Sequence, residues 1–364
     1  MIQARDESDI REAVAQAGGE GRTLEIRGRG TRGRMGGPVH ADEVLDVSGL
    51  DGVVLYEPNE LVLTVRPGAS VAEVRALLAA ERQHLAFEPP DFGVLWGAAP
   101  EAGTMGGLVS VGLGGPRRPF AGGPRDHLLG FKAVNGFAEA FAGGGRVVKN
   151  VTGFDLPKLM AGAYGTLAVL TELTLKVVPA PETSTTLVLA GLEEAEGLAV
   201  LRRAGASAVE PTACAYLPEN LAETPDGRSA TALRIEGPRA VAQAAVDRLR
   251  RDLDVGGVPA EVLPEDESRR FWRGIGGAEP LAAEAGSIWR ISAPATCAVA
   301  VADALRGLGA ERVLFDWSGG LVWAALPDAA FAGGDRLRPA LASIAPDAHA
   351  TLVRGVDGLA DRIP

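Results

Sequence analysis

The stretch IRGRGTRGRMGGP, residues 26–38, carries the spacing G-x-G-x-x-G at Gly28, Gly30 and Gly33. Glycines at this spacing bind a dinucleotide in a Rossmann unit only when a strand precedes them and a helix follows. The preceding residues 22–27, RTLEIR, alternate as a short strand does. The Gly-Gly-Pro run at the end of the stretch lacks helix propensity and a backbone donor. We therefore expect no helix there and exclude a Rossmann nicotinamide site.

The same glycines suit a second kind of anion site. Closely spaced glycines adopt positive φ and direct several N–H groups at one anion without needing a helix. A glycine-rich surface turn is the alternative, and these residues alone leave both readings open. Asp46, which ends VLDV, is predicted to be a strand-end or turn aspartate rather than a ribose ligand.

Composition and charge are those of an ordinary soluble globular protein. The chain has 364 residues, of which 46% are hydrophobic and 23% charged, enough for two domains and a large core. The 48 glycines, without collagen periodicity, indicate many tight turns and close backbone approaches. The net charge of -11 argues against a nucleic-acid partner, because phosphate binding depends on clustered Lys and Arg.

The N-terminus MIQARDESD is charged, so we expect no signal peptide. No apolar run approaches the roughly 20 residues of a membrane span. A cytoplasmic protein is expected, attached to a membrane only through partners.

Cys214 and Cys297 lie in apolar contexts and are predicted to be buried thiols. With no C-x-x-C spacing and no histidines at metal-ligand spacing, we expect no iron–sulfur, zinc or other metal site.

The first part of the chain is predicted to contain two helices among short strands. Residues 8–17 form an apolar stripe that Gly18 and Gly19 would end. Ser70, with Glu73 three residues on, forms a capping box for a second helix.

The character of the sequence changes at residues 87–127, which are crowded with Gly and Pro. A 40-residue irregular stretch in a compact domain is improbable unless it wraps a ligand, and we predict that role for it. The alternative, a disordered insert, is disfavoured by the apolar residues in the stretch.

A hairpin is predicted at Asn135-Gly136, and a short helix at residues 155–161. We predict a boundary at 179–182, PAPE, which gives domains 1–180 and 181–364. The second domain repeats strands and helices, which predicts antiparallel strands with helices on one face. The whole chain is then α+β.

Several longer motifs give the chain a family resemblance. They are FEPPDFG (87–93), GPRRPFAGG (115–123) and KNVTGFDLPKLMAGAYGTL (149–167). With IRGRGT before them, they resemble the FAD-binding domain of the vanillyl-alcohol oxidase and para-cresol methylhydroxylase superfamily. More narrowly, the chain resembles the FAD-binding subunits of bacterial glycolate oxidases, densely over the first 180 residues and more loosely beyond. The fold implied is a PCMH-type FAD-binding domain of two α/β subdomains, followed by a smaller α+β cap.

The resemblance implies that FAD is bound by three separate segments. Carried over residue by residue, the positions are Gly28, Arg29, Gly30 and Thr31; Gly103, Thr104, Gly106 and Gly107; and Gly153, Asp155, Gly162, Gly165, Thr166 and Val169. Asp155 has an equally weighted alternative as the cap of the helix that it opens. His40 and His127 sit in no attachment motif, so we expect non-covalent FAD.

The implied chemistry is oxidation of a 2-hydroxy acid, glycolate to glyoxylate, by the flavin. Such chemistry needs a cation for the substrate carboxylate and a base near the hydroxyl. Arg290 and His349 lie in the matching segments and are the candidates. The alternatives are a surface or ion-paired arginine and a strand-end histidine. Partners implied are a larger flavoprotein subunit, catalytic in its own right, and an iron–sulfur subunit that receives the electrons.

The sequence also departs from the family pattern. Ala168 and Val322 stand where relatives commonly have glycine and arginine, and the end DGLADRIP lacks the usual FDP and NPGR motifs of a segment that closes the FAD site. Val322 weakens any carboxylate site there, and together with the missing end motifs it favours a second hypothesis, a flavin-carrying scaffold subunit that stabilises a catalytic partner. Arg117 and Arg118 are predicted either to dock a partner or anion, or to be solvated loop residues.

Overall fold

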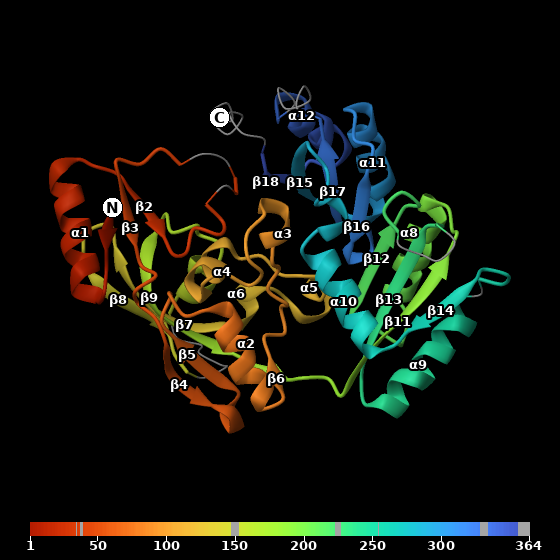
Figure 1. Cartoon of the computed structure of the whole chain (residues 1–364), viewed down its shortest axis with the longest axis horizontal. Helices are drawn as coiled ribbons and strands as arrows, with labels where there is room; N and C mark the ends of the chain where they lie inside the picture. Colours follow the sequence, from red (N-terminus) through yellow and green to blue (C-terminus); the bar gives the residue numbers. More distant parts are fainter. Residues whose placement is uncertain are drawn as a thin grey trace.

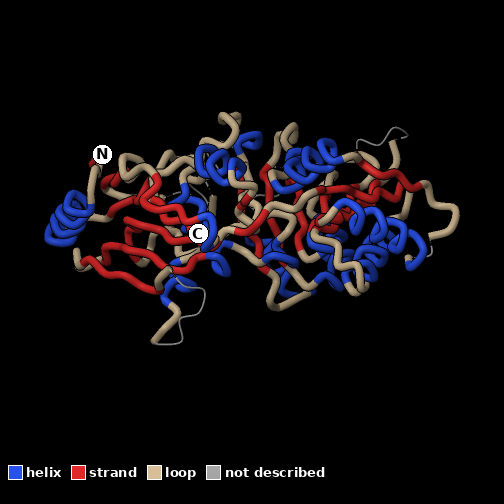
Figure 2. Tube along the Cα trace, turned by 90° about the horizontal axis from the view of Figure 1, so that it is seen from below, coloured by secondary structure: helices blue, strands red, loops and turns tan. Residues whose placement is uncertain are grey.

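The computed structural model describes residues 1–33, 35–36, 39–146, 153–222, 227–253, 255–327 and 334–355, with only the backbone of 334–335. Figure 1 shows two lobes side by side, an N-terminal lobe with strands β1–β10 and a C-terminal lobe with β11–β18. Figure 2 shows the strands of the two lobes as two separate groups. In the described part of the chain no sheet contains strands of both lobes.

The N-terminal lobe begins with a small parallel sheet of order β1–β3–β2, made of Ile2–Gln3, Glu43–Asp46 and Leu24–Arg27. Asp46 is the last residue of β3, as predicted, and its Oδ1 accepts a hydrogen bond from Ser48 N at 2.8 Å. None of the described residues between β2 and β3 is helical. The chain therefore lacks the strand–helix turn of a Rossmann unit.

Helix α1, Glu7–Glu20, packs its buried residues Ile10, Ala13 and Val14 against this sheet. The predicted end at Gly18 and Gly19 is wrong, because both glycines are helical. The helix ends at Gly21, whose φ of 66° is left-handed, a conformation that glycine adopts without steric cost.

A five-stranded antiparallel sheet forms the second layer of this lobe. Its order is β4 (Val53–Glu57), β5 (Val62–Val65), β9 (Ala168–Lys176), β7 (Leu128–Asn135) and β8 (Ala140–Gly144). The hairpin at Asn135-Gly136 is confirmed, with Asn135 N bonded to Glu139 O at 3.0 Å. Helix α2, Val71–Ala80, is capped as predicted by Ser70, whose hydroxyl accepts from Glu73 N. The two-residue strands β6 (Gln83–His84) and β10 (Val178–Pro179) pair beside it.

The stretch 87–127 contains more regular structure than the sequence suggested. It folds into four short helices, α3 (Gly93–Trp96), α4 (Met105–Val111), α5 (Arg118–Ala121) and α6 (Pro124–His127). A fifth, α7 (Leu156–Met160), follows β8 and confirms the helix predicted there. Glycines end α3, α4 and α5, so the helical segments are too short for their periodicity to be visible in the sequence.

The C-terminal lobe has one eight-stranded antiparallel sheet, of order β14-β11-β13-β12-β16-β17-β15-β18. The strands are β11 (Thr183–Ala190), β12 (Ala213–Leu217), β13 (Ala230–Gly237), β14 (Ala260–Leu263), β15 (Ser287–Ser292), β16 (Val313–Asp316), β17 (Leu321–Leu326) and β18 (His349–Arg354). The predicted α+β cap with an antiparallel sheet is confirmed.

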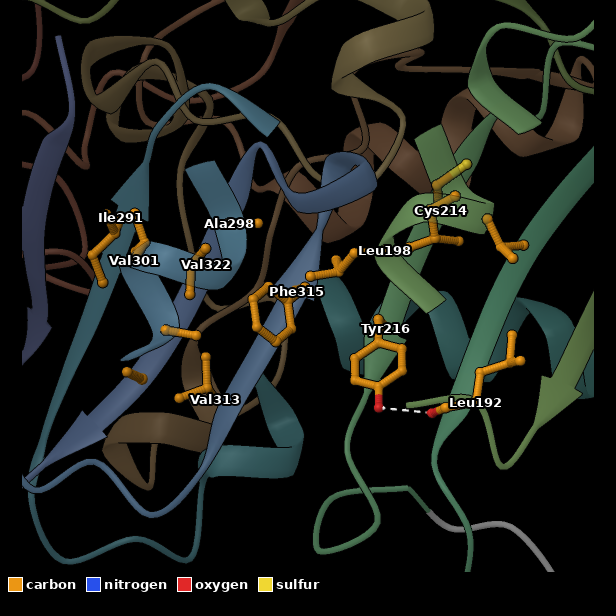
Figure 3. Packing of buried hydrophobic residues seen from close by; sticks show 14 of the residues in the cluster. Leu192, Leu198, Cys214, Tyr216, Ile291, Ala298, Val301, Val313, Phe315 and Val322 are labelled. Carbon is orange, nitrogen blue, oxygen red and sulfur yellow. Dashed lines mark hydrogen bonds between the residues drawn. The ribbon is translucent and has the colours of Figure 1, made fainter. Parts of the chain in front are cut away.

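Four helices cover one face of this sheet: α8 (Glu194–Gly205), α9 (Arg239–Asp252), α11 (Ala298–Gly307) and α12 (Gly334–Ile344). Figure 3 shows this core, in which Leu198 and Val301 of the helices lie close to Phe315 and Val322 of the strands. The prediction that all helices share one face is wrong. Helix α10, Glu265–Gly276, packs Trp272 and Ile275 on the opposite face.

That opposite face is also where the two lobes meet. Phe92 and Leu95 of the N-terminal lobe pack in one buried cluster with Ile288 and Trp323 of the sheet. Trp96 Nε1 donates across the junction to Val353 O at 3.2 Å. The helix-rich segment 87–127 therefore fills the space between the lobes, where Figure 1 places α3 and α5.

A group of charged side chains with little exposure joins the lobes beside this apolar contact. Arg234 of β13, 2% exposed, donates from Nη1 and Nη2 to the two carboxylate oxygens of Glu88 at 2.6 and 2.8 Å. Arg117 donates from its backbone N to Glu88 at 3.0 Å and pairs through its guanidinium with Glu236 at 3.3 Å. We call Glu88, Arg117, Arg234 and Glu236 the charge clamp.

The substitution Glu88→Gln should lower the free energy of unfolding by about 3 kcal/mol, because it leaves the Arg234 guanidinium buried without a full counter-charge. Urea unfolding of the two proteins measures this difference. The control Asp252→Asn removes the exposed ion pair with Arg248 and should cost less than about 0.5 kcal/mol. Equal losses in the two variants would contradict the role of the charge clamp.

Candidate functional site

The three glycine-rich segments singled out in the sequence lie against one another. A Cβ placed on Gly28 would lie 2.6 Å from Thr104 Oγ1, and one on Gly103 would lie 3.4 Å from Thr31 Oγ1. A Cβ on Gly165 would contact Ile26 Cβ at 3.4 Å. The loop after β2, the start of α4 and the elbow before β9 therefore converge at one place.

The first loop has the donors that an anion requires. Among the described residues, the backbone N–H groups of Gly28, Arg29, Gly30 and Thr31 donate no hydrogen bond. Gly30 has φ of 71°, the left-handed conformation that lets neighbouring N–H groups point the same way. These free amides, with the Thr31 hydroxyl, fit the pyrophosphate of a dinucleotide.

The second segment, GTMGG, is a helix start rather than the loop that the sequence suggested. Thr104 caps α4, its hydroxyl accepting from Gly107 N at 3.2 Å. A Cβ on Gly106 would lie 2.9 Å from Pro67 O, and Gly106 N donates to that oxygen at 2.7 Å. Gly106 is therefore explained by its contact with the loop before α2, and no cofactor contact is needed to account for it.

The third segment divides between exposed and buried positions. Gly153 is exposed with φ of 81°. Asp155 is exposed and caps α7, accepting from Lys158 N at 3.4 Å, which is the alternative considered for it. Val169 is 4% exposed and packs in the core beneath α1, so its side chain does not face the convergence of the three segments.

The elbow itself is bonded to α4. Gly162 N donates to Val109 O at 3.0 Å, and Tyr164 N donates to Ser110 O at 2.9 Å. A Cβ on Gly112 would lie 2.8 Å from Gly162 Cα. Thr166 is exposed, with its hydroxyl bonded to Ala163 O at 2.7 Å. The glycines here permit a close crossing of two backbones.

Arg32 is a candidate that the sequence analysis missed. A Cβ on Gly103 would lie 2.7 Å from its Nη1, and its Nη2 donates to Pro90 O at 3.3 Å. Burial lowers the pKa of Arg32, and the nearby Asp91 carboxylate partly opposes that change. Its place directly after IRGRGT is the signal that could have found it. The guanidinium adds positive charge to the amide donors of the first loop.

Arg290 lies in β15 on the face that meets the N-terminal lobe. It is 7% exposed, and its Nη2 is buried and donates no hydrogen bond to any described residue. Its guanidinium carbon lies 4.9 Å from the ring centroid of Trp317 and 5.9 Å from that of Trp323. Burial, with Arg118 nearby, lowers the pKa of Arg290 to about 10. Arg290 is thus a buried cation without a carboxylate partner in the described chain.

His349 starts β18, directly beside β15. It is opposite Ser292 in the ladder, two residues from Arg290, and the strand alternation puts both side chains on the same face. Diagonal positions of this kind have Cα atoms about 7–8 Å apart. His349 is exposed and makes no side-chain hydrogen bond to a described residue. The structure therefore brings the two candidates near each other but leaves the imidazole in solvent.

Trp317 and Tyr164 were not predicted from the sequence. Trp317 has φ of 54°, donates from Nε1 to Gly115 O of the N-terminal lobe at 3.1 Å, and donates from its backbone N to Asp316 Oδ1 at 2.7 Å. Tyr164, half exposed with φ of 54°, lies near enough to Arg290 to influence its pKa. Non-glycine residues with positive φ are uncommon and cluster at functional sites.

Two departures from the family pattern do not affect the sheet face that carries Arg290. Val322 is fully buried in the core between the sheet and its four helices, so it points away from Arg290. The inference that it weakens a carboxylate site there is wrong. Ala168 is 6% exposed and packs in the core of the N-terminal lobe. The third departure, the absent FDP and NPGR motifs at the end of the chain, lies outside the described residues.

The structure also places the arginines, cysteines and histidine that the sequence analysis singled out. Arg117 belongs to the charge clamp, so it is not a solvated loop residue, whereas Arg118 is exposed. Cys214 is buried, as predicted, and Cys297 is half-buried. His127 Nε2 lies 2.8 Å from Ala121 O. In the described ranges no three His, Cys, Asp or Glu side chains are grouped to hold a metal, and no helix there has the length and apolarity to cross a membrane.

Comparisons with known proteins define the class. Residues 1–140 match a family model described as an FAD binding domain. The structure is similar to that of p-cresol methylhydroxylase with substrate bound, with a TM-score of 0.71 and 14% identity, covering 94% of this chain and 79% of the other. The chain is an FAD-binding protein with the PCMH-type fold, and the predicted fold class and cofactor are confirmed.

Sequence relatives narrow this class. Glycolate oxidase subunit GlcE of Escherichia coli (strain K12) is 33% identical over 313 residues, 86% of this chain and 78% of that protein. Glycolate oxidase subunit GlcD of Bacillus subtilis (strain 168) is 33% identical over 164 residues, 44% of this chain and 33% of that protein. The chain belongs to the GlcE family of glycolate oxidase subunits and is an FAD-dependent oxidoreductase, which confirms the family resemblance.

We expect Gly28→Ala to weaken FAD binding about tenfold, because the added methyl group overlaps Thr104 Oγ1 and overpacking of this kind costs about 1–3 kcal/mol. The FAD dissociation constant, measured by titration of the apoprotein, tests this. Gly18→Ala, at an exposed helical position with no atom within 4 Å of the new Cβ, should leave the constant unchanged. Unaltered FAD affinity in Gly28→Ala would refute a role in FAD binding for the close approach of Gly28 to Thr104.

Because the carboxyl of Asp316 is buried, with 1% exposure, we expect the free energy of unfolding of the protein to depend on pH. Burial raises the pKa of its carboxyl from 3.8 to about 7. Stability from a group with a raised pKa is complete below the unfolded value and is lost as pH rises through the folded value. Asp316→Asn keeps an acceptor for Trp317 N without the charge. Its stability relative to the parent chain, measured by urea unfolding, should therefore rise between pH 5 and pH 8. A difference that is constant with pH would contradict the assignment.

Proposed function

We propose that this chain is the FAD-binding subunit of a 2-hydroxy acid oxidising complex, with glycolate as substrate and glyoxylate as product. In this proposal residues 1–180 form the FAD-binding domain and 181–364 the substrate domain. The family membership supports this role, since the GlcE and GlcD relatives are named as glycolate oxidase subunits. Bound FAD would supply the acceptor for the two electrons taken from the substrate.

The observation that carries the substrate class is the unpaired guanidinium of Arg290. A buried charge is costly unless it is paired, yet among the described residues Arg290 forms no ion pair, contacts the rings of Trp317 and Trp323, and has no acceptor for its Nη2. An arginine fork matches a carboxylate in a bidentate geometry. A small acid that places its carboxylate on Arg290 would satisfy the free Nη2 and neutralise the charge.

Proton transfer is assigned in this proposal to His349. Oxidation of a 2-hydroxy acid requires a base that takes the hydroxyl proton, and imidazole is the group most often used for this purpose. The neighbouring strand position and shared face support a substrate bound by both residues. The solvent exposure of His349 supports instead a second candidate function, a flavin-carrying scaffold subunit that turns over nothing itself.

The proposal also covers how FAD is bound and which subunits receive the electrons. FAD would be held non-covalently by the three converging segments, with the amides of the first loop and Arg32 on the pyrophosphate. Electrons would pass to an iron–sulfur subunit beside a larger, catalytic flavoprotein subunit, since the described residues group no ligands for a cluster of their own. A cytoplasmic chain at the inner membrane through these partners is the location that we propose.

Anaerobic addition of glycolate or D-lactate to the FAD-loaded chain should bleach the visible flavin band. In Arg290→Gln the KM for glycolate should rise about 100-fold, since a hydrogen-bonded charge contributes roughly 1.5–3 kcal/mol. Bleaching kinetics measure both. Arg248→Gln, an exposed change of equal charge on α9, is the control. A spectrum that stays oxidised with bound FAD would reject oxidation by this flavin in favour of the scaffold.

A further inference from the structure

Arg118 is the second cation beside Trp317. It begins α5 in the N-terminal lobe, and its guanidinium carbon lies 5.3 Å from the centroid of the Trp317 ring. Arg290 of the C-terminal lobe lies 4.9 Å from the same ring. One indole therefore has a guanidinium from each lobe in contact with it.

The two arginines repel each other, and the nearby Asp316, whose own pKa is raised by burial, opposes this repulsion only in part. Among the described residues neither forms an ion pair or a side-chain hydrogen bond with a carboxylate, whereas Arg248, Arg269 and Arg306 each form one at the surface. Contact with an aromatic face stabilises a guanidinium but leaves its N–H donors unused. The charge of Arg118 also disfavours the protonated form of Arg290. An anion placed near both would remove the repulsion and use the free donors.

Trp317 is fixed in place by both lobes. Its Nε1 donates to Gly115 O, three residues before Arg118, and Arg118 N donates to the same oxygen at 3.0 Å. On the other side, Asp316 accepts from the Trp317 backbone. The left-handed φ of Trp317 is a strained conformation that persists only when its surroundings hold it. The ring thus sets the spacing of the two guanidinium groups.

We propose that Arg118 and Arg290 form one carboxylate-binding site across the lobe junction, with Trp317 as its wall, so that the substrate acid is held by a residue of each lobe. This deepens the proposed function, on which it rests for the identity of the substrate. It makes Arg118 a specificity-determining residue that the sequence left undecided. A site with two cations also favours small dianions such as oxalate over monoanions of similar size.

Calorimetric titration of the FAD-loaded full chain with oxalate tests the site without turnover. We expect binding in the parent chain and at least about tenfold weaker binding in Arg118→Gln, because a charge-assisted hydrogen bond is lost. Arg250→Gln is the matched control. It removes the same charge from an exposed residue of α9, which packs on the other face of the eight-stranded sheet, and should change the constant less than about twofold.

The outcomes separate this inference from the proposed function. No oxalate binding, or equal effects of Arg118→Gln and Arg250→Gln, overturns the two-arginine site, even if glycolate still bleaches the flavin. Oxalate binding that depends on Arg118, in a chain that glycolate does not reduce, supports the site and rejects oxidation by this flavin. Because Arg118 is exposed, Arg118→Gln should keep the parent melting temperature, and a large decrease would assign Arg118 a structural role and also overturn the proposal.

Discussion

The bidentate bond between Arg234 and Glu88 is the contact on which the junction of the two lobes depends. It joins β13 to the segment between β6 and α3, and its guanidinium lies where water has little access. A buried pair with good geometry adds less to stability than its loss would remove. Its effect here is on orientation, because it fixes how the face of the eight-stranded sheet meets the helix-rich segment. The orientation of the lobes in turn determines which of their side chains contact Trp317.

Two buried arginines on the same sheet face have opposite surroundings. Arg234 is paired with Glu88 and Glu236 and stacks over Trp272, so its charge has partners on every side. Arg290 has aromatic contacts and an unused Nη2. Since folding alone rarely leaves a buried charge unpaired, the first arginine is accounted for by the fold. The second lacks such partners in the described chain, and this contrast is the reason for which we propose Arg290, and not Arg234, as a ligand-binding residue.

Sequence patterns predicted helices and strands well where a capping box, a turn signal or a hydrophobic period marked them. The capping box at Ser70, the hairpin at Asn135 and the short helix at residues 155–161 were found in this way. The short helices between residues 87 and 127 were not, because four-residue helices contain little more than one turn. Trp317 was missed for another reason: its importance comes from Arg118 and Arg290, two residues distant in the chain that only the folded sheet brings to one ring.

The glycines show why a motif can identify a site and still misplace its parts. Gly28 and Gly103 are required by the close approach of the first loop to the start of α4, whereas Gly106 is required by Pro67 and Asp155 serves its own helix. A family motif retains residues that contact the cofactor together with residues that only bring those contacts into position. The two kinds are indistinguishable in one sequence, because both appear as members of the same motif. They separate once the backbone shows which amides remain without an acceptor, and among the described residues four consecutive amides of this kind lie in the first loop.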